Sequence, residues 1–138
     1  MNVENLMTRN VVTIRPDSSV ADAAALMAVR EVGSVVVCRD DKAVGVITDR
    51  DIAVRVVAQG RDPKETPVGA VMTERLVTCL LGAPLWAAQE LMEGNGVRRL
   101  IVIDDAGSIR GVLSSDDLAM APAAELARPE PRLVEALM

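Results

Sequence analysis

The chain is almost without aromatic side chains, since Trp86 stands alone among its 138 residues and Phe and Tyr are absent. We therefore expect an aliphatic core, in which a planar ligand would lie against aliphatic side chains and backbone instead of stacking on rings. Histidine is also absent, which removes the commonest general base and metal ligand. No nucleophile–base pair takes its place, so we predict that the protein is not an enzyme.

Cysteine is scarce as well. Cys38 and Cys79 are far apart in the sequence, and no CxxC or Cys/His cluster exists, so we expect no zinc site and no other metal site. Both cysteines fall in predicted strands, where we expect them to pack as small apolar residues without forming a disulfide with each other.

Positive charge and long apolar runs are lacking too. The net charge is −5 and the isoelectric point is about 4.7, which argues against a nucleic-acid partner, because such binding rests on clustered Lys and Arg. No apolar run approaches the ~20 residues that span a bilayer, and the N-terminus lacks the pattern of a signal peptide. We therefore expect a cytoplasmic protein with no membrane partner.

A seven-residue pattern is present twice. Residues 45–51 (GVITDRD) and 111–117 (GVLSSDD) each read Gly, two apolar residues, a hydroxyl residue, two polar residues and Asp. Three other pairs recur at one constant offset: Met7-Thr8 with Met72-Thr73, Val12-Thr13 with Val77-Thr78, and Leu26-Met27 with Leu91-Met92. Such self-similarity indicates a duplicated structural unit.

The duplication divides the chain into two repeats, at 3–60 and 68–120. A linker with two prolines covers 61–67, and a tail covers 121–138, where 135–138 has the pattern of a short amphipathic helix.

Both repeats predict the same order of elements, β-α-β-β-α. In the first repeat the strands are expected at 11–14, 34–38 and 43–47, and the helices at 20–29 and from the seven-residue pattern to Gly60. In the second repeat the strands are expected at 76–79, 100–103 and 109–113, and the helices from Pro84 to Gly94 and from the pattern to Pro122. Ser19 and Asp22 have the spacing of a capping box before the first helix.

The Met-Thr pairs, the order of elements and the Gly-x-x-[Thr/Ser]-x-x-Asp ending together resemble the cystathionine-β-synthase (CBS) domain. The pair resembles a Bateman module over residues 3–120. Residues 48–52 (TDRDI), followed by 60–63 (GRDP), resemble stand-alone bacterial two-CBS proteins.

The resemblance implies an α/β (α+β) fold, in which the two repeats pack with pseudo-twofold symmetry, and a homodimer formed through the helices. It also implies a regulatory ligand that contains adenosine, such as AMP, ADP, ATP or S-adenosylmethionine, in the clefts between the repeats. No cofactor is required for such a role.

The residue types of the pattern suit a nucleotide. A carboxylate can accept hydrogen bonds from both ribose hydroxyls, which suits Asp51 and Asp117. Thr48 and Ser114, each at the expected start of a helix, suit a phosphate. The same Thr/Ser-to-Asp spacing also fits a capping box that contributes about 1 kcal/mol without any ligand. Both interpretations stay open, because a capping residue can exchange an amide for a ligand oxygen.

The two copies carry different charges. Arg50 adds positive charge in the first copy, where the second copy has Asp116, so electrostatics at the pattern favour phosphate at the first copy. Arg99 is the feature that would reverse this preference, because it precedes a buried strand and can bind phosphate bidentately. For its neighbour Arg98 we favour a solvated side chain or an ion pair.

Thr13 and Thr78 lie in the expected first strands of the repeats. The resemblance implies that this region lines the ligand cleft, and the alternative is an ordinary β-branched strand residue.

Two functions follow. The first is a sensor that binds an adenosine nucleotide and signals as a dimer. The alternative is a non-catalytic scaffold or dimerisation protein with unoccupied clefts, acting on a protein partner through its helical face or its tail.

Overall fold

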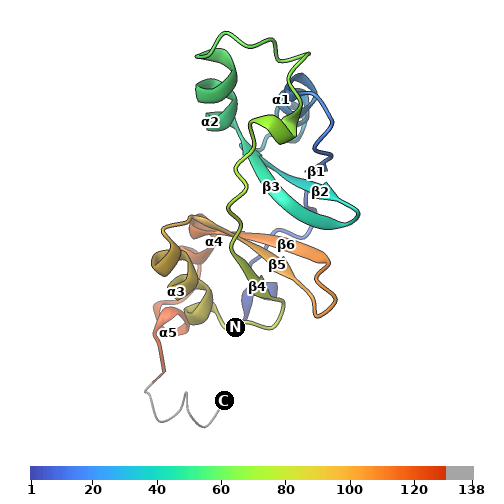
Figure 1. Ribbon diagram of the computed structural model, residues 1–138. Coiled ribbons are helices and arrows are strands. Elements are labelled where there is room, and N and C mark those ends of the chain that lie inside the picture. Colours follow the sequence, from blue (N-terminus) through green and yellow to red (C-terminus); the bar gives the residue numbers. More distant parts are fainter. Residues whose placement is uncertain (130–138) are drawn as a thin grey trace. The chain divides into compact units, whose positions relative to one another are not determined.

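The computed structural model describes residues 1–129 and shows two compact units (Figure 1). The first unit consists of Asn10–Leu76 together with Ala106–Ile109. Within the described residues, the second unit consists of Met1–Arg9, Val77–Asp105 and 110–129. Each unit thus combines segments that are distant in the sequence.

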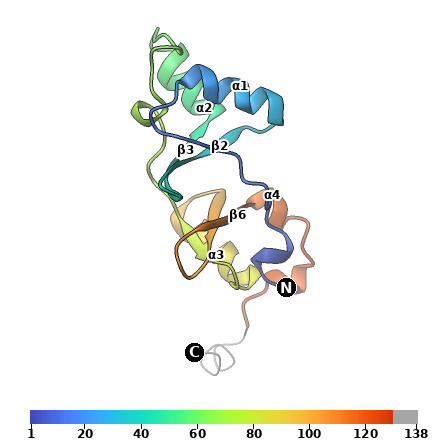
Figure 2. The same cartoon turned by 90° about the vertical axis from the view of Figure 1, so that its right-hand side faces the viewer.

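The first unit is built on a three-stranded sheet with the order β1-β2-β3. Its strands are β1 (Thr13–Ile14), β2 (Ser34–Arg39) and β3 (Lys42–Thr48), with β1 parallel and β3 antiparallel to β2. Its helices are α1 (Val20–Arg30) and α2 (Asp49–Ile52), and α2 continues into a π-helical turn (Ala53–Val57). A 3-10 turn follows at Val68–Ala70. Figure 2 shows α1 and α2 beside each other over the β2–β3 hairpin.

The second unit repeats this plan with the strand order β4-β5-β6. Its strands are β4 (Thr78–Leu80), β5 (Arg99–Ile103) and β6 (Ile109–Ser114), and β4 is parallel to β5. Its helices are α3 (Leu85–Asn95), α4 (Ser115–Leu118) and α5 (Ala123–Leu126), and a 3-10 turn lies at Val3–Asn5. The predicted α/β fold and the β-α-β-β-α order of both repeats are confirmed, whereas 135–138 lies outside the described residues.

Both cores are aliphatic, as expected from a chain with one aromatic residue. The buried core of the first unit contains Val20, Ala23, Met27, Val35, Val37, Ile47, Val56, Val68 and Val71. The buried core of the second unit contains Val3, Met7, Cys79, Leu85, Ala88, Met92, Leu100, Val102, Leu113 and Leu118.

Helix ends agree with the sequence at α1 but not at α3. The Ser19 hydroxyl accepts a hydrogen bond from the Asp22 amide (3.1 Å), so of the two bonds of the predicted capping box the structure shows this one. The predicted helix stop at Gly94 is wrong, because Gly94 lies inside α3 and Gly96 ends the helix with φ 63°. Glycine is the residue that most readily adopts the left-handed conformation at a helix end. Of Gly94 and Gly96, Gly96 is the one that adopts it.

Both cysteines are free thiols, Cys79 buried in β4 and Cys38 half-buried in β2. Burial raises the pKa of the Cys79 thiol from 9.0 to about 11. The pKa of Cys38 is also raised, by burial first and by the neighbouring Asp41 carboxylate second. Both thiols therefore stay protonated at neutral pH.

Each Met-Thr pair packs in the unit of the other repeat. The backbone of Thr73 exchanges two hydrogen bonds with Val46 of β3, at 2.8 and 2.9 Å. A side chain at Gly45 would place its Cβ 2.6 Å from Met72 Sδ and 2.9 Å from the Thr73 carbonyl oxygen. Glycine is thus required at the start of the seven-residue pattern because the segment 71–73 crosses directly over it.

The same arrangement recurs in the second unit. Thr8 exchanges two backbone hydrogen bonds with Val112 of β6, at 2.9 and 3.0 Å. A Cβ at Gly111 would lie 2.6 Å from Met7 Sδ and 2.9 Å from the Thr8 carbonyl oxygen. The compact units therefore divide the chain differently from the repeats. The repeat limits at 60 and 68 stay a prediction about the duplication.

Candidate functional site

The first copy of the seven-residue pattern joins β3 to α2 through a complete capping box. The Thr48 side-chain oxygen accepts a hydrogen bond from the Asp51 amide (3.0 Å), and Asp51 Oδ2 accepts one from the Thr48 amide (3.0 Å). Thr48 has extended backbone angles, which aim its side chain at the first turn of the helix. The capping interpretation of the Thr/Ser-to-Asp spacing is confirmed for this copy.

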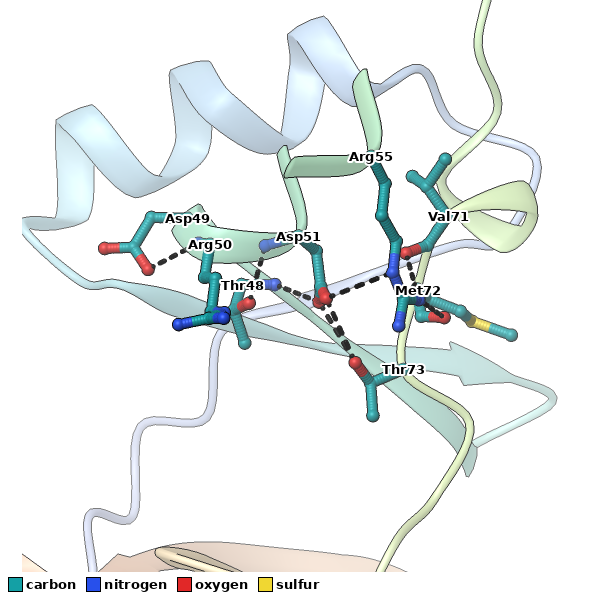
Figure 3. Close-up of polar contacts among 8 residues, drawn as sticks. All are labelled: Thr48, Asp49, Arg50, Asp51, Arg55, Val71, Met72 and Thr73. Carbon is teal, nitrogen blue, oxygen red and sulfur yellow. Dashed lines mark hydrogen bonds and ion pairs between the residues drawn. The ribbon is translucent and has the colours of Figure 1, made fainter. Parts of the chain in front are cut away.

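The Asp51 carboxylate has further partners that close it off from solvent (Figure 3). The Thr73 hydroxyl donates to both of its oxygens, at 3.1 Å to Oδ1 and 3.3 Å to Oδ2. Arg55 Nε lies 3.9 Å from Oδ1 and forms an ion pair. Asp51 is 7% exposed, so this charge is stabilised by the protein's own donors.

Arg55, which follows α2, also holds the segment 71–73 against that helix through hydrogen bonds to its backbone. Its Nη1 atom donates to the carbonyl oxygens of Val71 and Met72, each at 3.0 Å. One guanidinium thus contacts the carboxylate of the pattern and the backbone of the segment that crosses over it (Figure 3).

The second copy has the same capping box but a more open carboxylate. The Ser114 hydroxyl accepts from the Asp117 amide (3.1 Å), and Asp117 Oδ2 accepts from the Ser114 amide (2.8 Å). Thr8 and Ala121 occupy the positions that correspond to Thr73 and Arg55. Within residues 1–129 the structure shows no further partner for the Asp117 side chain, which is partly exposed. Its Oδ1 atom is therefore available to a ligand donor.

The predicted arginines are exposed. Figure 3 shows Arg50 and Arg55 on opposite sides of the Asp51 carboxylate, so Arg50 takes no part in closing it. Arg99 begins β5, and over the described part of the chain neither it nor Arg98 forms an ion pair. For Arg98 the sequence left a solvated side chain and an ion pair open, and the side chain is exposed in the structure. The phosphate role of Arg50 and Arg99 stays a prediction.

Thr13 and Thr78 lie away from the pattern of their own unit. In the first unit β2 separates β1 from β3, so Thr13 and Thr48 are on different edges of that strand. Thr13 instead lines a pocket of about 630 Å³ that also involves Cys38, and Thr78 lines one of about 840 Å³ that involves Ile103, the counterpart of Cys38. The structure therefore brings Thr48 together with Asp51, and Ser114 together with Asp117, and leaves the two strand threonines in separate pockets.

Thr73 and Arg55 are the two site residues that the sequence did not identify. The recurrence of Met72-Thr73 was a signal that this segment has a fixed role, but the repeat does not say what it contacts. Arg55 follows Asp51 by four residues, which is the spacing of an ion pair on one helical face.

Among residues 1–129 no group of three Cys, Asp or Glu side chains is arranged to hold a metal ion. In the same range no helix is both long and apolar enough to cross a membrane.

Comparisons with known proteins agree on one family. The family model of the CBS domain matches residues 3–58 and 68–124. The CBS domain-containing protein YhcV of Bacillus subtilis is 38% identical over 86% of this chain and 84% of its own length.

Two solved structures have the same fold. Hypoxic Response Protein I, solved with two coordinated zinc ions, has a TM-score of 0.77 and 26% identity over 88% of this chain and all of its own. The CBS domain protein PAE2072 of Pyrobaculum aerophilum, solved in complex with AMP, has a TM-score of 0.80 and 28% identity over 91% of this chain and 98% of its own.

Proposed function

This chain belongs to the CBS-domain family as a tandem pair, and we propose that it is a non-catalytic regulatory protein that binds an adenosine nucleotide and signals as a homodimer. The observation that carries the proposal is the Asp117 carboxylate, which has one oxygen held by the capping box and one without a partner among residues 1–129. The AMP complex of PAE2072, a structural relative at 28% identity, supports an adenine nucleotide as the ligand class.

The chemistry of the second copy fits the sugar and phosphate of such a ligand. Asp117 Oδ1 can accept a charge-assisted hydrogen bond from a ribose hydroxyl. The Ser114 hydroxyl already accepts a bond from an amide, which leaves its own proton for a ligand oxygen. Asp117 and Ser114 therefore supply one acceptor and one donor at the same helix start.

The two copies are not equivalent, and geometry outweighs charge in deciding between them. An exposed arginine such as Arg50 contributes about 0–1 kcal/mol to an ionic contact. The hydrogen bond from Thr73 to the charged Asp51 contributes about 1.5–3 kcal/mol, and a ligand that takes its place loses this amount. We therefore propose Ser114 and Asp117, with Arg99 as a source of positive charge, as the first site to fill. Thr48, Asp51 and Arg50 form the weaker site.

Thermal unfolding with a panel of AMP, ADP, ATP and S-adenosylmethionine tests the proposal. A nucleotide at 100 times its Kd stabilises the folded protein by about 2.7 kcal/mol, which is well resolved as a rise in Tm. We expect a rise for the wild type and for Glu65→Ala, a control that removes an exposed carboxylate in the linker. Replacing Asp51 and Asp117 together with Ala should abolish it. No rise with any of the four ligands at millimolar concentration would contradict the proposal.

A scaffold without ligand is the second candidate, and the closed state of Asp51 favours it for the first copy. A carboxylate whose partners lie within the protein needs no ligand to be stable in a buried position. The scaffold is supported if the wild type sediments as a dimer and its Tm is unchanged by every nucleotide of the panel.

A further inference from the structure

We propose that the segment 71–73 and Arg55 form a latch that holds the first copy closed, and that a ligand at Asp51 has to open it. The inference rests on the proposed nucleotide-binding function. It adds that ligand binding moves the segment 71–73 at the first copy and moves no such segment at the second.

The latch consists of three contacts on one short segment. The Thr73 hydroxyl bonds both oxygens of Asp51, and Arg55 bonds the carbonyl oxygens of Val71 and Met72 while pairing with Asp51. The donors that satisfy the carboxylate are therefore fixed to the backbone that covers it. Asp51 is 7% exposed and Thr73 lies on Oδ1, so a ribose hydroxyl that bonds this oxygen has to displace the Thr73 side chain and its hydrogen bond.

The position of the latch in the chain gives it a consequence beyond the site. The first unit includes the chain up to Leu76, and the next residue, Val77, already belongs to the second unit. Only Glu74 and Arg75 separate Thr73 from Leu76. Occupation of Asp51 thus acts close to one of the points at which the chain passes from one unit to the other.

The second copy lacks this device although its fold is the same. Thr8 bonds Val112 through its backbone as Thr73 bonds Val46, but over residues 1–129 its hydroxyl has no bond to Asp117. Ala121 has no group that could replace the Arg55 guanidinium. A ligand therefore binds the second copy without displacing protein contacts, whereas at the first copy it has to open the latch.

Calorimetric titration with AMP tests the latch in a background that isolates the first copy. In Asp117→Ala protein, the additional change Thr73→Val removes one hydroxyl and keeps the side-chain shape. We expect it to tighten AMP binding about tenfold or more, because the ligand no longer competes with a hydrogen bond to a charge. Thr73→Ser restores the hydroxyl and should restore the weaker affinity.

The matched control is Thr8→Val in Asp51→Ala protein, where the affinity of the second copy should change less than twofold. Hydrogen exchange gives a second readout, since the Val46 amide is bonded to the Thr73 carbonyl oxygen. Saturating AMP should accelerate exchange of this amide in Asp117→Ala protein. An AMP affinity that Thr73→Val does not change, or an exchange rate of the Val46 amide that AMP does not change at saturation, would overturn the latch alone. Absence of heat from every variant and the wild type would overturn the proposed function and the gating together.

Discussion

The hydroxyl of Thr73 donates to both carboxylate oxygens of Asp51, and the two residues come from different repeats of the sequence. Asp51 closes the capping box of the first repeat, while Thr73 belongs to the Met-Thr pair that begins the second. In both copies the backbone of a Met-Thr pair crosses over the glycine of a seven-residue pattern, which explains why the two features occur together.

The two aspartates of the pattern should differ in their contribution to stability. Asp51→Ala leaves the part-buried Thr48 amide and the Thr73 hydroxyl without their acceptor and removes the carboxylate partner of Arg55, so we expect a loss of about 3–5 kcal/mol in the free energy of unfolding. Asp117→Ala removes little more than a capping bond, so a loss of about 1 kcal/mol is expected. Urea denaturation of both variants measures the difference. Equal losses in the free energy of unfolding would show that the extra contacts of Asp51 do not stabilise the protein.

Gly45 should not tolerate a methyl group. The added Cβ of Gly45→Ala meets the Thr73 carbonyl oxygen at 2.9 Å, and because this atom belongs to the backbone the crossing segment has to move. We expect destabilisation by about 1–3 kcal/mol, as in other overpacked sites. Gly82→Ala is the control, because no atom lies within 4 Å of its Cβ position and its effect should stay within about 0.5 kcal/mol. Similar urea midpoints for the two variants would refute the close crossing.

The two glycines at the end of α3 should respond in opposite directions. Gly94 is inside the helix with open space around its Cβ position, so Gly94→Ala should stabilise the protein by about 0.5–1 kcal/mol. Gly96 has φ 63°, where a Cβ is strained, so Gly96→Ala should destabilise it by about 1–2 kcal/mol. Thermal unfolding of the pair provides the comparison, and a stabilising Gly96→Ala would place the helix end elsewhere.

The buried Cys79 thiol should make stability fall at alkaline pH. Well below pH 9 the thiol is protonated in the folded and the unfolded chain, so it adds no pH dependence there. Between pH 9 and about 11 the unfolded chain loses the proton and the folded protein keeps it, which favours unfolding.

Cys79→Val isolates this contribution, because valine resembles Ile14 at the matching position of the first repeat. Urea denaturation across this pH range should show the wild type losing more stability than the variant. Parallel curves for the two proteins would mean that the thiol ionises equally in both states.

The capping boxes and most strands could be predicted from the sequence because they depend on neighbours. Thr48 and Asp51 are three residues apart, and the apolar runs that became β2 and β5 are continuous. The partnership of Asp51 with Thr73 spans 22 positions, and no local pattern encodes it. The same limit applies to Arg55, whose backbone partners Val71 and Met72 become its neighbours only when the segment 71–73 folds back onto β3.

The helix stop in α3 shows a different limit. Gly94 and Gly96 are both glycines near the end of the apolar periodicity, and composition does not distinguish them. The backbone decides, since Gly96 takes the left-handed conformation while Gly94 stays helical.

Calorimetric titration of AMP into the wild type, Asp51→Ala and Asp117→Ala tests the central claim most directly. We predict saturable binding to the wild type, retention of the tighter site in Asp51→Ala, and its loss in Asp117→Ala. Binding that survives in Asp117→Ala and disappears in Asp51→Ala would contradict the assignment of the open second copy as the first site to fill.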